Sequence, residues 1–98
     1  MAKSTRREVM KILCSQVYEK QLKIILTEMS QVSLKEAKDF KLYLDTIIIN
    51  IPTKAKKYKQ STLCKDENIK DIEYNGYKIP FFLNLEENIY LVLGIVKK

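Results

Sequence analysis

The sequence predicts an α+β fold of order β-α-α-β-β-β, a two-layer sandwich in which a helical hairpin packs on one face of a mainly antiparallel sheet. Three observations lead to this prediction. Residues 69–98 hold three apolar runs separated by turn signals, which is typical of an antiparallel meander. Two helical stripes joined by a short link precede the meander. Residues 9–15 form a short apolar strand that must join the meander, because it is too short to stand alone.

Length and composition indicate one domain with a modest core. The 98 residues are 46% hydrophobic, which argues against a disordered chain. We assign the polar, basic residues 1–9 to a disordered leader and residues 10–98 to a single domain. No apolar run approaches the ~20 residues of a membrane span, and no signal-peptide pattern is present. We therefore expect a cytoplasmic protein without a membrane partner.

The side chains available for chemistry are few. The chain contains no histidine, which excludes catalytic triads, histidine general bases and almost every zinc site. Cys14 and Cys64 lack the CxxC spacing of metal sites, so we expect two isolated thiols, no metal and no cofactor. The formal net charge of +6 favours a polyanion or an acidic protein as the partner.

Both predicted helices carry an apolar stripe that faces the sheet. The first begins at Ser15 or Gln16, and the second ends at Pro52, because the residue before a proline is pushed out of helical geometry. A link near residues 30–32 turns the chain, so the two helices form an antiparallel hairpin. The stripe of the first helix is Tyr18, Leu22, Ile25, Leu26 and Met29, and that of the second is Ala37, Phe40, Leu44, Ile47, Ile48 and Ile51.

The second helix is predicted to begin with a capping box. In this motif the Ser33 hydroxyl accepts a hydrogen bond from the N–H of Glu36, and the Glu36 carboxylate accepts one from the N–H of Ser33. Val32 and Ala37 are placed as the apolar pair that flanks such a box.

A basic connector, residues 53–65, follows the second helix. Its lysines are Lys54, Lys56, Lys57, Lys59 and Lys65, and Tyr58 stands among them. This pattern is compatible with a contact surface for phosphates or for an acidic protein groove. For a run of like charges, however, a solvated loop is the more frequent outcome.

The meander begins with a hairpin closed by Asn75-Gly76, because a type I′ turn requires positive φ at both central residues. A two-residue loop pairs Tyr74 with Tyr77 and Ile72 with Ile79 on one face. A three-residue loop, 86–88, then places Ile89 opposite Leu85. The apolar face therefore continues through Phe81, Leu83, Leu85, Leu91, Leu93 and Ile95.

The last strand is apolar on both sides, which favours a central position in the sheet. Pro80 lacks an N–H and indicates an edge position or a bulge in the middle strand. In this register the other sheet face is partly open and carries Lys78, Phe82, Tyr90 and Val92. We expect a partner to lie there, although the termini of the chain could also cover Phe82.

From about Met10 onwards the chain resembles the RelE/ParE superfamily of toxins from bacterial type II toxin–antitoxin modules. The matching motifs are the A-x-x-F opening and closing proline of the second helix (Ala37, Phe40, Pro52), the strings 57–61 and 67–72, the GY-x-I strand (Gly76, Tyr77, Ile79) and the closing basic strand 91–98. The resemblance implies one of two activities. RelE-like members cut messenger RNA on the ribosome, and ParE-like members bind and block DNA gyrase. Each is held inactive by an antitoxin that wraps around it.

The RelE-like activity requires cations that stabilise the transition state of an attack on phosphate. If the chain were such a nuclease, the resemblance would assign this role to Lys78, Lys97 and Lys98. Two further basic residues of that branch would fall near Ile69 and Asp71, which are not basic. Lys70 lies between these positions and would point to the opposite face of the sheet.

The missing cations favour a ParE-like toxin that inhibits DNA gyrase by binding and is neutralised by a cognate antitoxin. The alternatives are a nuclease whose partners are the ribosome and mRNA, and an inactive antitoxin-binding module. Many ParE-like members carry Tyr-Arg where this chain has Phe81-Phe82, which puts an apolar ring on the open face. Homodimerisation stays undecided. We predict partner contacts at Lys57, Tyr58, Lys59, Lys70, Lys78, Phe82, Tyr90, Lys97 and Lys98.

Overall fold

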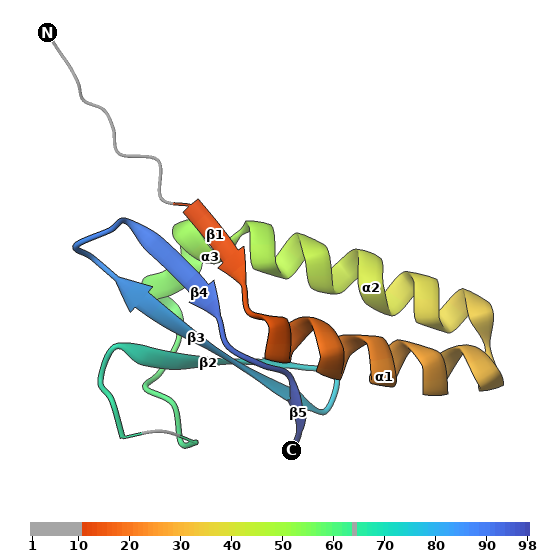
Figure 1. Ribbon diagram of the computed structural model, residues 1–98. Helices are drawn as coiled ribbons and strands as arrows, with labels where there is room; N and C mark the ends of the chain where they lie inside the picture. Colours follow the sequence, from red (N-terminus) through yellow and green to blue (C-terminus); the bar gives the residue numbers. More distant parts are fainter. Residues whose placement is uncertain (1–10, 64) are drawn as a thin grey trace, which may run out of the picture.

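Helices cover one face of a mainly antiparallel sheet (Figure 1). The computed structural model describes residues 11–63 and 65–98, so the predicted leader and the first two residues of the predicted first strand lie outside the described part. The elements are β1 (Lys11–Cys14), α1 (Gln16–Val32), α2 (Leu34–Ile49), α3 (Ile51–Lys54), the 3₁₀ turn η2 (Ala55–Lys57), β2 (Ile69–Tyr74), β3 (Tyr77–Asn84), β4 (Ile89–Val92) and β5 (Val96–Lys97). The predicted fold class is confirmed.

The sheet has the strand order β1-β4-β3-β2, and the short β5 pairs with β3 beyond the end of β4. β1 runs parallel to β4, whereas all the other pairs are antiparallel. The predicted first strand therefore joins the meander, and it does so beside β4. This arrangement makes β4 an internal strand, as its apolar sequence indicated.

Serine side chains cap the N-termini of both long helices. The Tyr18 N–H donates to Ser15 Oγ at 3.0 Å, which caps α1. At α2 the Glu36 N–H donates to Ser33 Oγ at 3.2 Å, which confirms one half of the predicted capping box. The other half is wrong: the Ser33 N–H donates to the carbonyl of Met29 at 2.9 Å and is not free for the Glu36 carboxylate.

The helical hairpin turns more tightly than predicted. α1 continues to Val32, so the link is Ser33 alone, which ends α1 and begins α2. Val32 is 86% exposed and cannot form the predicted pair with Ala37. Pro52 does not end α2 either. That helix stops at Ile49, and Pro52 stands in the first turn of α3, where a missing N–H removes no helical hydrogen bond.

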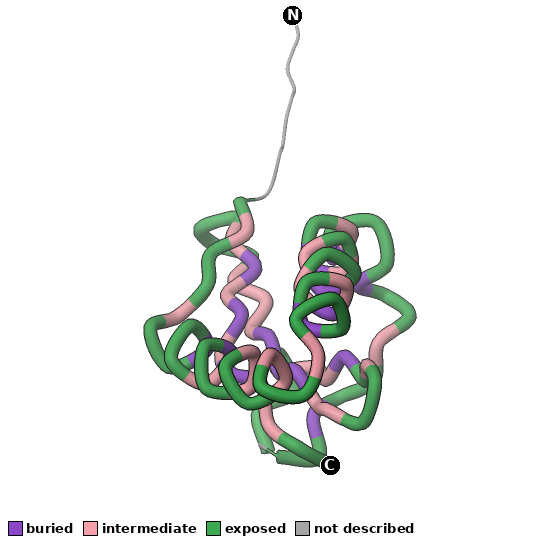
Figure 2. Tube along the Cα trace, turned by 90° about the vertical axis from the view of Figure 1, so that its right-hand side faces the viewer, coloured by how far each residue is buried: buried purple, intermediate pink, exposed green. Residues whose placement is uncertain are grey.

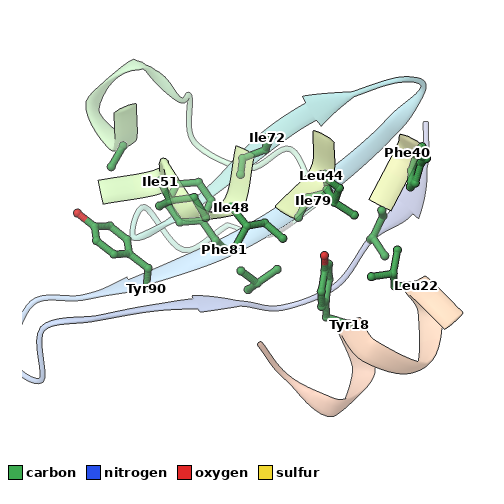
Figure 3. Close-up of a cluster of buried hydrophobic side chains, with 13 residues drawn as sticks. Tyr18, Leu22, Phe40, Leu44, Ile48, Ile51, Ile72, Ile79, Phe81 and Tyr90 are labelled. Carbon is green, nitrogen blue, oxygen red and sulfur yellow. The ribbon is translucent and has the colours of Figure 1, made fainter. Parts of the chain in front are cut away.

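The core lies between the helical hairpin and the sheet (Figure 3). Figure 2 shows buried residues where the two layers face one another and exposed residues on the outer turns of the helices. The buried members include Tyr18 and Leu22 of α1, Phe40, Leu44 and Ile48 of α2, and Ile72, Ile79, Phe81 and Val92 of the strands. Both predicted helical stripes thus pack on the sheet, with Ile25, Leu26, Met29 and Ile47 partly buried around the centre.

The two hairpins of the meander differ in how well the sequence predicted them. Tyr74 pairs with Tyr77 and Ile72 with Ile79, as predicted. Asn75 and Gly76 have φ angles of 52° and 87°, as a type I′ turn requires. The second hairpin is shifted by one residue from the prediction.

In that second hairpin Ile89 pairs with Asn84 rather than with Leu85. The loop is stabilised by the Asn84 side chain, whose Oδ1 accepts from the Glu87 N–H at 3.1 Å, and by Asn88 at φ 55°. Because side chains alternate along a strand, a one-residue shift moves the side chains of β4 to the other face. The open-face positions predicted for Tyr90 and Val92 are therefore wrong: Tyr90 is 6% exposed and Val92 is fully buried in the core.

Pro80 lies in an internal strand, so the predicted edge position is wrong. The Leu93 N–H donates to the Pro80 carbonyl at 2.8 Å, but Pro80 has no N–H to return a bond. The regular pairing of β4 ends at this point and resumes with Val96 opposite Lys78, after one extra residue. The irregularity thus occurs in the strand facing Pro80, where the Ile95 N–H donates to the Gln21 side chain at 2.9 Å.

Candidate functional site

The sheet face that points away from the helices carries an apolar row across four strands. Register places Leu13 of β1 beside Leu91 of β4, Leu91 beside Phe82 of β3, and Phe82 beside Ile69 of β2. These side chains are half-buried or exposed. We call this face the open face and this set the apolar row. A continuous row of large apolar side chains is typical of a protein contact surface.

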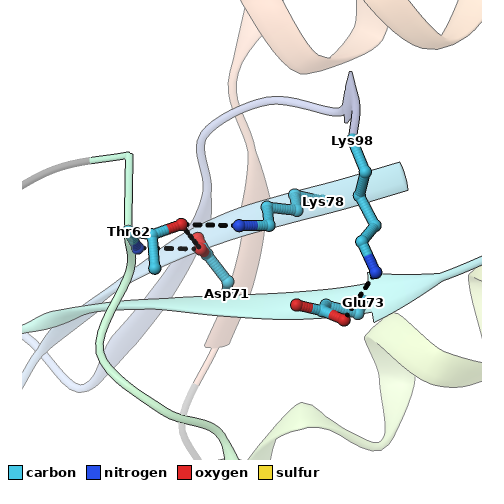
Figure 4. A network of polar contacts seen from close by, with 5 residues as sticks. All are labelled: Thr62, Asp71, Glu73, Lys78 and Lys98. Carbon is cyan, nitrogen blue, oxygen red and sulfur yellow. Dashed lines mark hydrogen bonds and ion pairs between the residues drawn. The ribbon is translucent and has the colours of Figure 1, made fainter. Parts of the chain in front are cut away.

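Polar groups of β2, β3, the connector and the C-terminal end of the chain gather on the same face (Figure 4). The Thr62 N–H donates to Asp71 Oδ2 at 3.0 Å, and Lys78 Nζ donates to Thr62 Oγ1 at 2.6 Å. Lys98 Nζ lies 3.0 Å from Glu73 Oε1. Two cations thus alternate with two carboxylates over a small area. The hydrogen bond and charge of Lys98 lower the pKa of Glu73, so this carboxyl is ionised at neutral pH.

The basic connector runs along the outer edge of β2. The Ser61 N–H donates to the Ile69 carbonyl at 2.7 Å, and the Asp71 N–H donates to the Lys59 carbonyl at 3.1 Å. Lys70 Nζ donates to the Ala55 carbonyl at 3.0 Å. These bonds cover an edge that would otherwise expose unpaired backbone groups.

The predicted partner-binding residues divide into three groups. Lys78, Phe82 and Lys98 lie together on the open face, while Lys57 and Lys59 are exposed on the connector. Lys97 faces Tyr77, and Lys70 faces Phe81, on the opposite side of the sheet. Both tyrosines of the set, Tyr58 and Tyr90, pack on Phe81 and belong to the structure of the core.

The aromatic contacts explain the position of these two tyrosines. The Tyr58 ring meets Phe81 edge-on with centroids 5.6 Å apart, and the Tyr90 ring lies 6.2 Å from Phe81 on centroids. Burial raises the pKa of Tyr58. Tyr90 is buried, so its predicted place on the open face is wrong, whereas Tyr58 is half-buried. The predicted partner contacts of both tyrosines stay predictions.

Several residues of the open face were absent from the predicted set. Glu73 could have been placed opposite Lys78 from the Asn75-Gly76 turn alone, since the turn fixes the register. Leu91 was missed because of the one-residue shift. The position of Thr62 depends on the path of the connector, for which the sequence carries no periodic signal.

In residues 11–63 and 65–98 no group of three or more His, Cys, Asp or Glu side chains could hold a metal ion. None of the helices in this part of the chain is long and apolar enough to cross a membrane. The groups on the open face are ammonium, carboxylate, hydroxyl and apolar side chains.

The fold is similar to two solved toxin–antitoxin structures. The chain aligns with a chain of the chromosomal ParDE system from P. aeruginosa with a TM-score of 0.72 and 11% identity, over 93% of this chain and 98% of that chain. It aligns with a chain of the toxin–antitoxin complex RelBE2 from Mycobacterium tuberculosis with a TM-score of 0.56 and 6% identity, over 91% and 98%. The sequence matches no protein-family model and no curated protein. The chain therefore has the RelE/ParE-like fold that the sequence motifs implied.

Proposed function

We propose that the protein is the toxin of a type II toxin–antitoxin module, and that it acts in the cytoplasm by binding DNA gyrase rather than by catalysis. The observation that carries this proposal is the similarity over nearly the whole chain to the ParDE system, whose TM-score of 0.72 exceeds the 0.56 found for RelBE2. The open face supplies the second argument, because its geometry favours binding over phosphate chemistry.

A nuclease of the RelE type would need cations that converge on one phosphate. Lys97 points to the other side of the sheet from Lys78 and Lys98. The two remaining cations stand beside the carboxylates of Asp71 and Glu73, which would repel a phosphate group. Glu73 is also a poor general base, because its pKa is lowered by Lys98.

The apolar row suits a protein partner. The apolar row of Leu13, Leu91 and Phe82 offers apolar contact area. Lys78 and Lys98 lie farther along the same face and can steer an acidic surface towards it. An antitoxin segment with acidic and apolar residues has this chemistry, and we propose that it covers Phe82 and the connector lysines. It would neutralise the toxin by occupying the contact surface for gyrase.

The similarity to RelBE2 makes the ribosome-dependent nuclease the second candidate. Lys78 and Lys98 do share one face, so a substrate that displaced Thr62 and Glu73 from them could use both ammonium groups. The third candidate, an inactive module that only binds its antitoxin, differs from both in having no effect on either target.

The test is a gyrase supercoiling reaction with the wild-type protein and two variants. Phe82→Asp places a charge in the apolar row, whereas the control Leu85→Asp changes a side chain that is 68% exposed in the neighbouring loop. We expect inhibition and accumulation of linear DNA with the wild type and with Leu85→Asp, and loss of both with Phe82→Asp.

A reconstituted translation mix distinguishes the alternatives. Cleavage of mRNA that disappears in Lys78→Ala and Lys98→Ala, together with unaffected supercoiling, would replace the gyrase proposal with the nuclease. No effect in either assay would leave only the antitoxin-binding module.

A further inference from the structure

The basic connector and the end of α2 carry positive charge with no acidic side chain among it. Residues 46–65 contain five lysines and neither aspartate nor glutamate. All five lysines are exposed, and we call the four closest in sequence the lysine strip: Lys54, Lys56, Lys57 and Lys59. In the part of the chain that the structure describes, the ion pairs are made by other lysines, namely Lys35, Lys41 and Lys98. The charge of the strip is therefore available to an external anion.

The backbone beneath the lysine strip is held against the sheet. Ala55 and Ser61 are buried, with exposed fractions of 6% and 5%. Lys70 Nζ of β2 donates to the Ala55 carbonyl at 3.0 Å, and the Tyr58 ring packs against Phe81 with centroids 5.6 Å apart. Anchored residues thus alternate with exposed lysines. A loop that only solvates its charges needs no such anchors, whereas a binding surface gains from them, because less backbone has to be ordered on binding.

The composition of the exposed surface indicates the class of partner. In residues 52–60 the exposed side chains are one proline, one threonine, one glutamine and the four lysines, and no large apolar side chain is exposed. Interfaces between proteins have an apolar centre and are depleted in lysine. Interfaces with nucleic acids are polar and strongly positive, and most of their hydrogen bonds go to phosphate and sugar. The lysine strip therefore fits a nucleic acid better than an acidic protein.

The aromatic side chain of the strip distinguishes a duplex from a single strand. Proteins bind single strands by stacking the bases on exposed aromatic rings. Tyr58 stands between the lysines, but its ring is half-buried and engaged with Phe81, so it offers no free stacking surface. Lysine contacts phosphate as a point charge and carries little sequence information.

We propose that the lysine strip binds the phosphate backbone of duplex DNA without regard to sequence. The choice of DNA over duplex RNA rests on the proposed function, because the proposed target acts on DNA. The charge and the composition of the strip support a duplex backbone independently of that function.

The position of the strip allows DNA and a protein to be bound at the same time. The strip begins in α3 and reaches the outer edge of β2, where the Lys59 carbonyl accepts from the Asp71 N–H at 3.1 Å (Figure 1). Thr62, three residues later, contacts Lys78 of the open face. DNA along this edge thus lies beside the surface that we propose for gyrase. Two linked contacts raise the affinity for a gyrase–DNA complex above that of either contact alone.

Fluorescence anisotropy of an end-labelled DNA duplex of mixed sequence, titrated with the purified protein in the absence of gyrase, tests the proposal. We expect binding that weakens as potassium chloride is raised. The slope of log affinity against log salt should be about −3 to −4, because about 0.9 counterion is released for each phosphate that one of the four lysines neutralises. A single strand of the same length should bind more weakly.

Two double variants with the same loss of charge locate the binding surface. Lys56→Gln with Lys57→Gln should weaken binding at low salt by about tenfold or more and make the slope shallower by about 2. The control, Lys20→Gln with Lys23→Gln, removes two exposed lysines of α1 and should leave the dissociation constant within about twofold of the wild type. Circular dichroism verifies that both variants are folded.

Three results would overturn the proposal. The first is no binding of the duplex at the lowest salt concentration. The second is an equal loss in both double variants, which would mean that net charge and not the lysine strip determines binding. The third is tighter binding of a single strand, or of an RNA duplex of the same length, than of the DNA duplex.

The supercoiling reaction keeps this proposal separate from the proposed function. A protein that binds duplex DNA through the strip but leaves gyrase unaffected would contradict the proposed function alone. A protein that inhibits gyrase but does not bind the duplex would contradict the DNA contact alone.

Discussion

Phe81 and Phe82 are adjacent, chemically identical and on opposite faces of β3, so truncating each in turn tests which face of the sheet is buried. Phe81 is fully buried between the rings of Tyr58 and Tyr90, whereas Phe82 lies half-buried in the apolar row. Phe81→Ala should lower the free energy of unfolding by about 3–5 kcal/mol, the range for truncating a core phenylalanine. Phe82→Ala removes a side chain that water already reaches and should cost about 1 kcal/mol.

Urea unfolding followed by far-ultraviolet circular dichroism measures both costs. With a slope of about 1–3 kcal/mol per molar urea for a domain of this size, Phe81→Ala should lower the midpoint by about 1–5 M. Phe82→Ala should lower it by less than about 1 M. If Phe81→Ala does not fold, Phe81→Leu and Phe82→Leu give the same ordering with smaller differences.

Equal costs, or a larger cost at Phe82, would refute the assignment of the two faces. Because Tyr90 lies on the same side of the sheet as Phe81, that result would mean that Tyr90 also lies on the open face, as the sequence predicted. Inhibition of gyrase should show the opposite ordering, with the folded Phe82 variant the more impaired.

Three further changes have expected outcomes. Tyr18→Phe should leave the free energy of unfolding unchanged or raise it by about 1 kcal/mol, because the hydroxyl is buried without a hydrogen-bond partner among the described residues. Burial raises the pKa of Tyr18, so its contribution to stability is complete below its unfolded pKa of about 10 and is lost as pH rises through the folded value. Denaturation series at pH 7 and pH 11 should accordingly show a smaller alkaline loss in Tyr18→Phe. Ser33→Ala should lower the free energy of unfolding by about 1 kcal/mol, the usual effect of losing an N-cap. Ser15→Ala should lower it by more, because the Ser15 hydroxyl also donates to the Leu93 carbonyl at 2.8 Å. Equal melting temperatures of the two variants would contradict this. Gly76→Ala should destabilise the β2–β3 hairpin by about 1 kcal/mol in thermal unfolding, because its φ of 87° disfavours any residue with a Cβ, and an unchanged melting temperature would argue against the type I′ turn.

The elements that the sequence predicted well are those with a local cause. The Asn75-Gly76 turn set the register of β2 and β3, because positive φ at two successive residues permits one hairpin geometry. Ser15 and Ser33 fixed the starts of the two helices through hydrogen bonds that span three residues.

The errors arose at two irregularities, one made by a local side-chain bond and one by a contact between distant parts of the chain. The loop before β4 holds a side-chain bond between Asn84 and Glu87, and its extra residue moved Tyr90 and Val92 into the core. Pro80 lies in an internal strand because the chain opposite it bulges towards Gln21 of α1, a contact 74 residues away in sequence. Neither feature leaves a periodic pattern in the sequence.

The same distinction applies to the candidate site. Lys78 and Phe82 could be placed on the open face from the hairpin register alone. The attachment of Thr62 to Asp71 and Lys78, and the ion pair of Lys98 with Glu73, depend on how the connector and the C-terminal strand return to the sheet. These contacts reduce the number of cations available to a phosphate, which is one reason why we propose binding rather than cleavage.

The measurement that tests this account most directly is a titration of the purified protein into a gyrase supercoiling reaction. We predict that supercoiling falls with added protein, that linear DNA accumulates, and that Phe82→Asp removes both effects while Leu85→Asp keeps them. Unchanged supercoiling at a large molar excess of folded protein would contradict the account.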